Sequence, residues 1–341
     1  MKEHGKDVPV THVLIRGNAH IEGDAVDPAF VSVLSPPSPV IDVPEHGRSS
    51  GRRLALANWI TSESHPLTAR VMVNRIWQYH FGRGIVRSSN DFGFQGTLPT
   101  HPLLLDYLAK QFVDGGWKLK ALHRKIMLSS TYCMGNGFSE HSYQKDPLND
   151  LFWRFDMRRL TAEEVRDSIL AVSGRLNRQK MHGPSVFTKL SKEVLAGQSI
   201  PGNGWGSSSA EDQLRRSIYI HVKRSLRVPI IQNFDGADTD STCPVRFNTT
   251  QPTQALGMLN SELTNREAEN FAQRITNDHS DLNNQIQAIL QRVTQRKPDD
   301  ADIAEGGELV RQWRAAGMSK EQSLKYYCLL AFNLNEFIFV R

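Results

Sequence analysis

The chain has 341 residues, of which 39% are hydrophobic and 23% charged, a balance that is typical of globular proteins and excludes disorder as the default. Lysine and arginine number 41 against 36 aspartates and glutamates, and the basic residues form only short clusters, which argues against nucleic acid as a partner. No apolar run approaches the roughly 20 residues of a membrane span, and the N-terminus shows no apolar signal-peptide region.

The three cysteines, Cys133, Cys243 and Cys328, are widely separated. Their spacing contains no CxxCH haem-attachment motif, no zinc-ligand pair and no disulfide framework. Two arrangements stay open, namely one disulfide with a leftover thiol or three buried free thiols. We therefore expect no cofactor within this chain.

Residues 1–50 are predicted to form an extended arm with one strand, because an apolar run at 11–17 precedes a segment rich in proline and serine. Residues 51–176 are predicted to form a helical subdomain. Thr161 and Glu164 have the spacing of a capping box at the start of its last helix. The helices are expected at 52–60, from Pro66 to a stop at Gly82, at 103–113, at 119–130 and at 161–176.

Residues 177–212 are rich in glycine, proline and serine, which predicts a long loop and a candidate lid. The remainder, 213–341, is expected to begin with a strand at 217–224, for which 11–17 is a candidate partner, and to continue as a helical subdomain, either separate from 51–176 or joined to it. Its helices are expected at 252–277, 283–296, 302–316 and 319–333. The predicted fold class is mainly α, a multi-helix globular domain with a small β-strand pair and long irregular loops.

An ordered series of short motifs runs along nearly the whole chain. The series comprises Pro66-Leu-Thr-Ala-Arg-Val-Met-Val-Asn-Arg-Ile-Trp77, His80-Phe-Gly-Arg-Gly84, Asp91-Phe-Gly93, His101-Pro102, Leu122-His-Arg-Lys-Ile126, Ser129-Ser-Thr-Tyr132, Asp146-Pro147, Arg158-Arg-Leu-Thr-Ala-Glu-Glu-Val-Arg-Asp167, Ser173-Gly174, Arg215-Arg-Ser217, Phe234-Asp235, Gln254-Ala-Leu256 and Asn335-Glu-Phe337. From about residue 12 onward, the chain resembles domain of unknown function 1553, a family found in very large proteins of planctomycetes and related bacteria. It departs from the family pattern at His65, Cys133 and Ala237, where asparagine, arginine and proline are usual.

The resemblance implies no established activity. Family members usually carry an upstream c-type haem domain and a companion domain of unknown function, which implies export to the periplasm or cell surface. This chain is accordingly expected to be one part of a larger protein. Its expected partners are the upstream domains of the same protein, with haem c as a cofactor of an absent upstream domain.

Several polar residues are candidates for ligand binding. Arg70, Asn74 and Arg75 share the polar arc of the helix after Pro66 and could clamp a carboxylate, sulfate or phosphate. The alternative is an ordinary amphipathic helix whose arginines pair with nearby acids. Further ligand-binding candidates in the family motifs are Asp91, Arg124 and Arg159.

The catalytic candidates are Glu163, Asp167, His101 and His123. Glu163 and Asp167 lie one helical turn apart and could perform acid/base chemistry, although nearby arginines favour structural salt bridges instead. His101 and His123 could take part in a polar site, but neither has a second metal ligand three or four residues away, which favours a packing role.

The candidates for metal binding are Asp235, Asp238 and Asp240. Their spacing could suit a calcium loop, but the EF-hand order is not met, and a turn held by aspartate hydrogen bonds accounts for it equally well.

Two hypotheses follow for function. The first is an uncharacterised accessory or ligand-binding module of a large exported bacterial multidomain protein. The alternative is an enzyme that acts on carbohydrate or another extracellular polymer through an Asp/Glu/Arg/His cleft, with anionic carbohydrate as the candidate partner. The sequence leaves open whether the chain is an enzyme at all.

Overall fold

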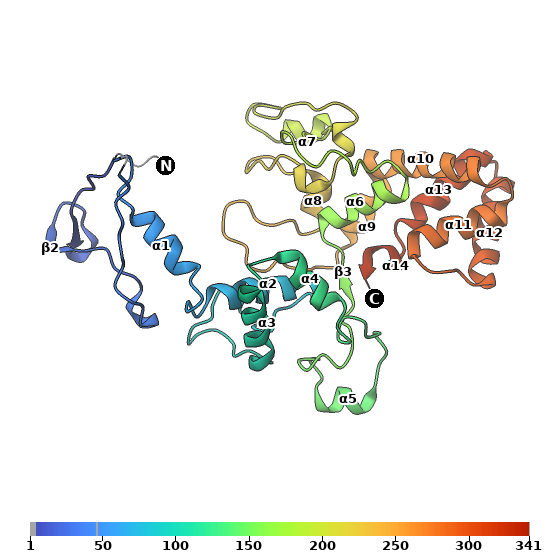
Figure 1. Ribbon diagram of the computed structural model, residues 1–341. Helices are drawn as coiled ribbons and strands as arrows, with labels where there is room; N and C mark the ends of the chain where they lie inside the picture. The colour runs from blue at the N-terminus through green and yellow to red at the C-terminus, as the bar shows by residue number, and fades with distance from the viewer. Residues whose placement is uncertain (1–4, 46, 341) are drawn as a thin grey trace. The chain divides into compact units, whose positions relative to one another are not determined.

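The computed structural model describes residues 5–45 and 47–340. Within these ranges it contains fourteen α-helices and two small antiparallel strand pairs, which confirms the mainly α fold class (Figure 1). The chain divides into two compact units: unit 1 comprises Met1–Met134 and Phe138–Arg154, and unit 2 comprises Gly135–Gly137 and Phe155–Arg341. The predicted division of the chain into an arm (1–50), two helical subdomains (51–176 and 213–341) and a loop (177–212) stays a prediction. No helix in the described part of the chain is long and apolar enough to cross a membrane.

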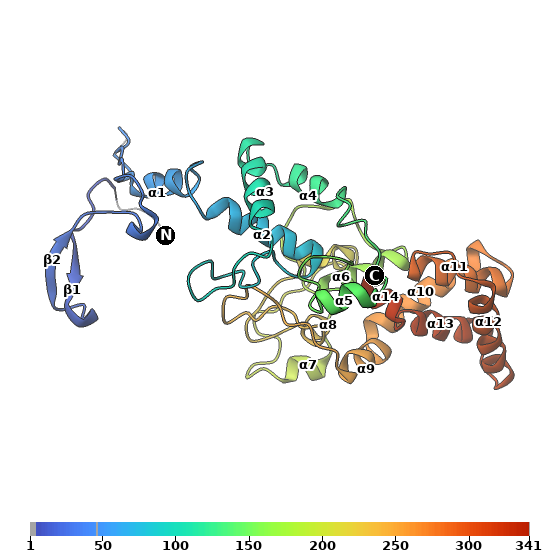
Figure 2. The same cartoon turned by 90° about the horizontal axis from the view of Figure 1, so that it is seen from below.

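Unit 1 begins with a β-hairpin, in which β1 (Thr11–Leu14) pairs with β2 (Glu22–Val26), as Figure 2 shows. The short 3-10 helix η1 (Ile15–Gly17) lies between them, and η2 (Ser32–Leu34) follows. The candidate pairing of 11–17 with 217–224 does not occur. The strand pairs instead with the segment that follows it in sequence, because closing so short a loop costs little conformational entropy.

The helices of unit 1 are α1 (Arg52–Ile60), α2 (Thr68–Phe81), α3 (Pro102–Asp114), α4 (Leu119–Met127) and α5 (Glu140–Lys145). The first four follow the predicted order, although α4 ends three residues earlier than predicted, and the short α5 was not predicted. Gly82 ends α2 as predicted, with a φ of 79° that glycine adopts without strain. The start of α2 lies two residues after Pro66, where the imidazole of His65 accepts hydrogen bonds from the backbone N–H groups of Leu67 and Thr68.

Unit 2 starts with β3 (Arg158–Arg159), which pairs with β4 (Phe339–Val340) near the end of the chain. The next element, α6 (Ala162–Val172), has the predicted capping box between Thr161 and Glu164. It ends earlier than predicted because Gly174 turns the chain with a φ of 81°.

The middle of unit 2 contains only short elements. They are α7 (Lys192–Ala196), η3 (Asp212–Leu214), η4 (Ser217–Tyr219) and α8 (Pro229–Asn233). The predicted strand at 217–224 is wrong, because the carboxylate of Asp167 accepts hydrogen bonds from both the N–H and the hydroxyl of Ser217 and holds this segment as a 3-10 turn.

The long segment 177–212 is tied down by a single buried guanidinium. Arg215 is 1% exposed and donates hydrogen bonds to the carbonyls of Lys180, His182 and Pro184 at 3.0 to 3.2 Å. These three bonds fix the start of the segment, so a lid movement that included residues 180–184 would have to break them.

The C-terminal part of unit 2 is a helical bundle, coloured orange to red in Figure 1. It comprises α9 (Pro252–Asn260), α10 (Glu262–Asp278), α11 (Leu282–Thr294), α12 (Asp300–Ala315), α13 (Lys320–Ala331) and α14 (Asn335–Ile338). The prediction of one helix over 252–277 is wrong: Ser261 is extended, and its hydroxyl caps α10 through the N–H of Thr264. Fully buried Phe271, Ile275 and Phe332 lie in the core between these helices and α6.

Candidate functional site

The three anion-clamp candidates of α2 point to different surroundings within unit 1. Arg70 pairs with Asp106 at 2.6 Å. Asn74 is fully buried, and its carboxamide accepts from the N–H of Val86 at 2.8 Å and donates to the carbonyl of the same residue at 3.0 Å. Arg75 is exposed. The prediction that Asn74 lies on the polar arc of α2 is therefore wrong. Its buried carboxamide has a structural role, because it satisfies the N–H and the carbonyl of Val86.

Two further candidates of unit 1 make local contacts. The carboxylate of Asp91 accepts a hydrogen bond from the N–H of Gly93 at 2.8 Å, an arrangement typical of an Asx turn. The ring nitrogen Nδ1 of His101 lies 3.0 Å from the hydroxyl of Thr100, and the imidazole packs near the ring of Phe152.

The remaining histidine candidate belongs to a constellation that joins three family motifs. Nε2 of His80, in the last turn of α2, lies 2.8 Å from Nδ1 of His123 in α4. The ring centroids are 5.1 Å apart, the separation expected when two imidazoles meet tip to tip in a hydrogen bond. Tyr132, in the turn after α4, stands edge-on to His80 at 5.4 Å. All three side chains are half-buried.

The histidine pair lies beside a strongly basic segment. Between Gly115 and Gly135 the sequence has four lysines and arginines and no acidic residue. Lys120 and Arg124 are exposed and make no hydrogen bond or ion pair with the described residues. Arg124, a predicted ligand-binding residue, thus stays available to a ligand at the surface of α4.

The acidic candidates of α6 are engaged with other parts of unit 2. Glu163 forms a two-pronged ion pair with Arg246, with N to O distances of 2.6 and 3.0 Å. Asp167 accepts from Ser217 and lies 3.6 Å from the buried guanidinium of Arg166. These carboxylates fasten α6 to the chain around residues 217 and 246 and do not face a common ligand.

Arg159 and Asp235 form a largely buried ion pair within unit 2. The guanidinium of Arg159, with a side chain only 4% exposed, donates to the carboxylate of Asp235 at 2.7 Å and to the carbonyls of Phe234 and Thr249. Burial alone would raise the pKa of Asp235, but hydrogen bonds from Thr249 and the charge of Arg159 outweigh it, so the pKa is lowered.

The three metal candidates use different partners. Asp235 pairs with Arg159, Asp238 with Arg227 and Asp240 with Arg224. Among the residues that the structure describes, no group of three or more metal-ligating side chains comes together.

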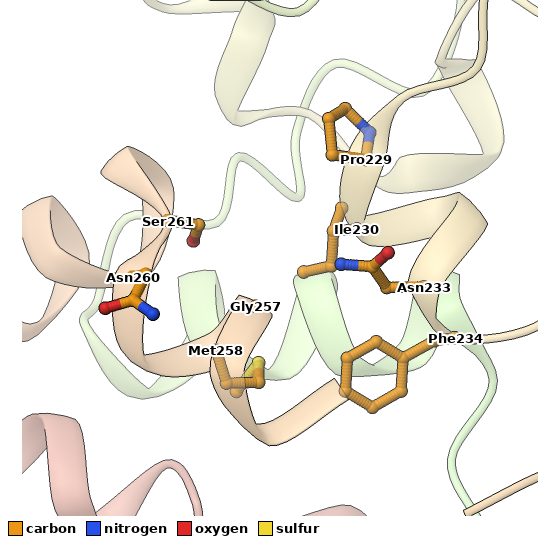
Figure 3. Close-up of a pocket in the computed structure, with 8 residues that line it drawn as sticks. All are labelled: Pro229, Ile230, Asn233, Phe234, Gly257, Met258, Asn260 and Ser261. Atoms are coloured by element: carbon orange, nitrogen blue, oxygen red, sulfur yellow. The ribbon is translucent and has the colours of Figure 1, made fainter. Parts of the chain in front are cut away.

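A pocket with a volume of about 250 Å³ lies between α8, α9 and the start of α10, wholly within unit 2 (Figure 3). Its lining includes Ile230, Phe234 and Met258, of which the last two are almost fully buried. The carboxamides of Asn233 and Asn260 lie on opposite sides of the pocket in Figure 3. This combination of an apolar floor and amide groups is typical of small-molecule sites.

Sequence reasoning missed His80, Tyr132 and the pocket around α8. His80 and Tyr132 each belong to a motif of the family series, so motif membership was the signal that could have identified them. The pocket has no such signal, because its lining comes from helices whose packing no local pattern specifies.

The comparisons with known proteins give a family but no characterised relative. No curated protein and no solved structure matches the chain. Residues 52–310, most of the chain, match the family described as PSD1, protein of unknown function (DUF1553), and the chain therefore belongs to this family, as its motifs predicted.

Proposed function

We propose that this chain is an accessory, ligand-binding module of a large exported bacterial protein that also carries a c-type haem domain. The c-type haem domain that usually precedes this family's domain supports both the association with haem and a periplasmic or cell-surface location. This sequence has no haem-attachment motif of its own, so the haem would belong to an upstream domain.

The observation that carries the binding role is the pocket between α8 and α9. Its volume of about 250 Å³ is smaller than the roughly 300 to 1,000 Å³ of typical ligand pockets, so it suits one chemical group of a larger molecule. The buried Phe234 and Met258 provide an apolar floor, while Asn233 and Asn260 provide amide donors and acceptors. A sugar unit, with apolar ring faces and polar hydroxyls, matches this lining.

The contacts of the acidic candidates favour binding over catalysis. A general acid that works near neutral pH needs a raised pKa. The pKa of Asp235 is lowered, and Glu163 is clamped by Arg246. The polymer-degrading enzyme therefore has less support than the binding module.

The pocket can be tested with a thermal-shift screen of neutral, uronic-acid and sulfated sugars. We expect at least one sugar to raise Tm, because a ligand that binds only the folded state stabilises it. Asn260→Trp at the pocket rim should abolish this shift by blocking the opening. Leu259→Trp is the matched control, since Leu259 is also exposed in α9 but does not line the pocket. An equal response of the two variants, or no response to any sugar, would contradict the proposal.

The haem link has a separate test. Cells that express the full-length protein should contain it in the exported fraction with a covalent haem absorbance spectrum. A cytoplasmic protein without haem would contradict this part of the proposal and leave the pocket test unaffected.

A further inference from the structure

The histidine pair belongs to unit 1 and has no part in the proposed pocket, which is lined by residues of unit 2. We infer that His80 and His123, together with Lys120, form a binding site for an oxyanion of the sulfate or phosphate class, and that the site binds when the pair holds one additional proton. This inference does not depend on the proposed function.

Counting hydrogens shows what the pair can do. Two neutral imidazoles have four ring nitrogens and two N–H hydrogens, so with one hydrogen between the rings, one outer nitrogen donates and the other accepts. One added proton gives three hydrogens, so both outer nitrogens become donors and the pair becomes a cation. A second added proton would put a hydrogen on each facing nitrogen, and the bond of 2.8 Å between Nε2 of His80 and Nδ1 of His123 would be lost.

The outer nitrogen of His123 is placed to use this donor. Nε2 of His123 has no hydrogen-bond partner within residues 5–45 and 47–340, and the side chain is half-buried. A charge-assisted hydrogen bond from an imidazolium to an oxyanion is about twice as strong as a neutral one. The partly buried setting strengthens that bond further, because less water competes for the anion.

The neighbouring charges favour an anion as the occupant. Lys120 lies one helical turn before His123, on the same side of α4, and is exposed. Arg124 follows on the adjacent side, while Lys125 is directed to Tyr107 and Gln111 of α3. Near the end of α2, Arg83 is directed to the carbonyls of Leu148 and Asn149, and the ring of Tyr132 packs against that of His80.

The backbone beside His80 also favours a positive charge on the pair. His80 lies in the last turn of α2, where the helix dipole favours a positive charge. The ammonium of Lys120 is kept at the surface. A bound oxyanion would therefore stabilise the protonated pair, and the protonated pair would bind the oxyanion more tightly.

Sulfate is the suitable probe, because its charge does not change in the neutral range, whereas phosphate titrates there. Isothermal titration calorimetry of the full chain with sulfate should show binding at about pH 5.5 that weakens by about tenfold or more at about pH 8, where an ordinary histidine is neutral. His123→Gln keeps a hydrogen-bonding group opposite His80 but removes the ring whose outer nitrogen donates to the anion, so it should lower sulfate binding at about pH 5.5 and reduce the difference between the two pH values. His141→Gln, an exposed histidine of α5 in the same unit, is the matched control and should behave as the wild type.

Lys120→Gln provides a second test that does not disturb the histidine pair. Because Lys120 is exposed and makes no hydrogen bond or ion pair with the described residues, the variant should fold normally and bind sulfate several-fold more weakly. This test decides the matter if His123→Gln does not fold. Sulfate binding that is equal at both pH values, absent at both, or unchanged in either variant would overturn the inference.

Discussion

Arg159 is both a predicted ligand-binding residue and a buried structural group, and its replacement distinguishes the two roles. Arg159→Met removes hydrogen bonds to the carboxylate of Asp235 and to the carbonyls of Phe234 and Thr249. Since the side chain is only 4% exposed, water cannot fully replace these bonds. Breaking one side of a buried ion pair costs about 3 to 5 kcal/mol. This loss is a large part of the roughly 5 to 15 kcal/mol that stabilises a typical domain.

Urea denaturation followed by far-UV circular dichroism measures this loss as a change in the free energy of unfolding. Arg224→Met is the matched control, because its side chain is 72% exposed and its ion pair with Asp240 contributes little. We expect Arg159→Met to be strongly destabilised and Arg224→Met to be within error of the wild type. A double variant that also carries Asp235→Asn should lose less than the sum of the single variants, since both act on one contact. If Arg159→Met were as stable as the control, the structural role would be refuted and Arg159 would return to the ligand-binding candidates.

Three further predictions follow from individual side chains. The folded-state pKa of Asp235 is lowered, so its contribution to stability is fully present above the ordinary pKa of about 3.9 and is lost as pH falls below that value. Asp235→Asn should therefore flatten the acid limb of a plot of the free energy of unfolding against pH. Gly306→Ala should lower Tm, because the added Cβ would clash with the hydroxyl of the buried Tyr327. An unchanged Tm would show that α12 and α13 can move apart at little cost. Cys133 is exposed, whereas Cys328 is buried and its burial raises the pKa of its thiol. A thiol reagent should therefore modify Cys133 at once and Cys328 only in denaturant. Equally fast labelling of both would contradict the burial of Cys328.

The helices were predictable where the signals that begin and end them are local. The capping box of Thr161 and Glu164 and the stop at Gly82 each depend on residues within one turn of the helix, and the structure confirms them. The failures have non-local causes. Segment 217–224 has the alternation of a strand, but Asp167, some fifty residues earlier in the chain, holds its first residue in a turn.

The candidate site was predictable only in part, for the same reason. The sequence identified His123 as a residue of interest and placed His80 and Tyr132 in family motifs. It could not show that the two imidazoles meet, because their hydrogen bond joins α2 to α4 across 43 positions. In the same way, Glu163 and Asp167 have the spacing of an acid pair, yet Arg246 and Ser217 engage them separately.

The sequence by itself determined the mainly α class, the family and the position of most helices, because helix periodicity, caps and motifs are written into neighbouring residues. Only the tertiary structure decided which polar side chains are structural and which are available to a ligand. That distinction depends on burial and on partners distant in the chain. Arg159 and Asn74 are buried and hydrogen-bonded to such partners. Lys120 and Arg124, in contrast, are exposed beside the histidine pair.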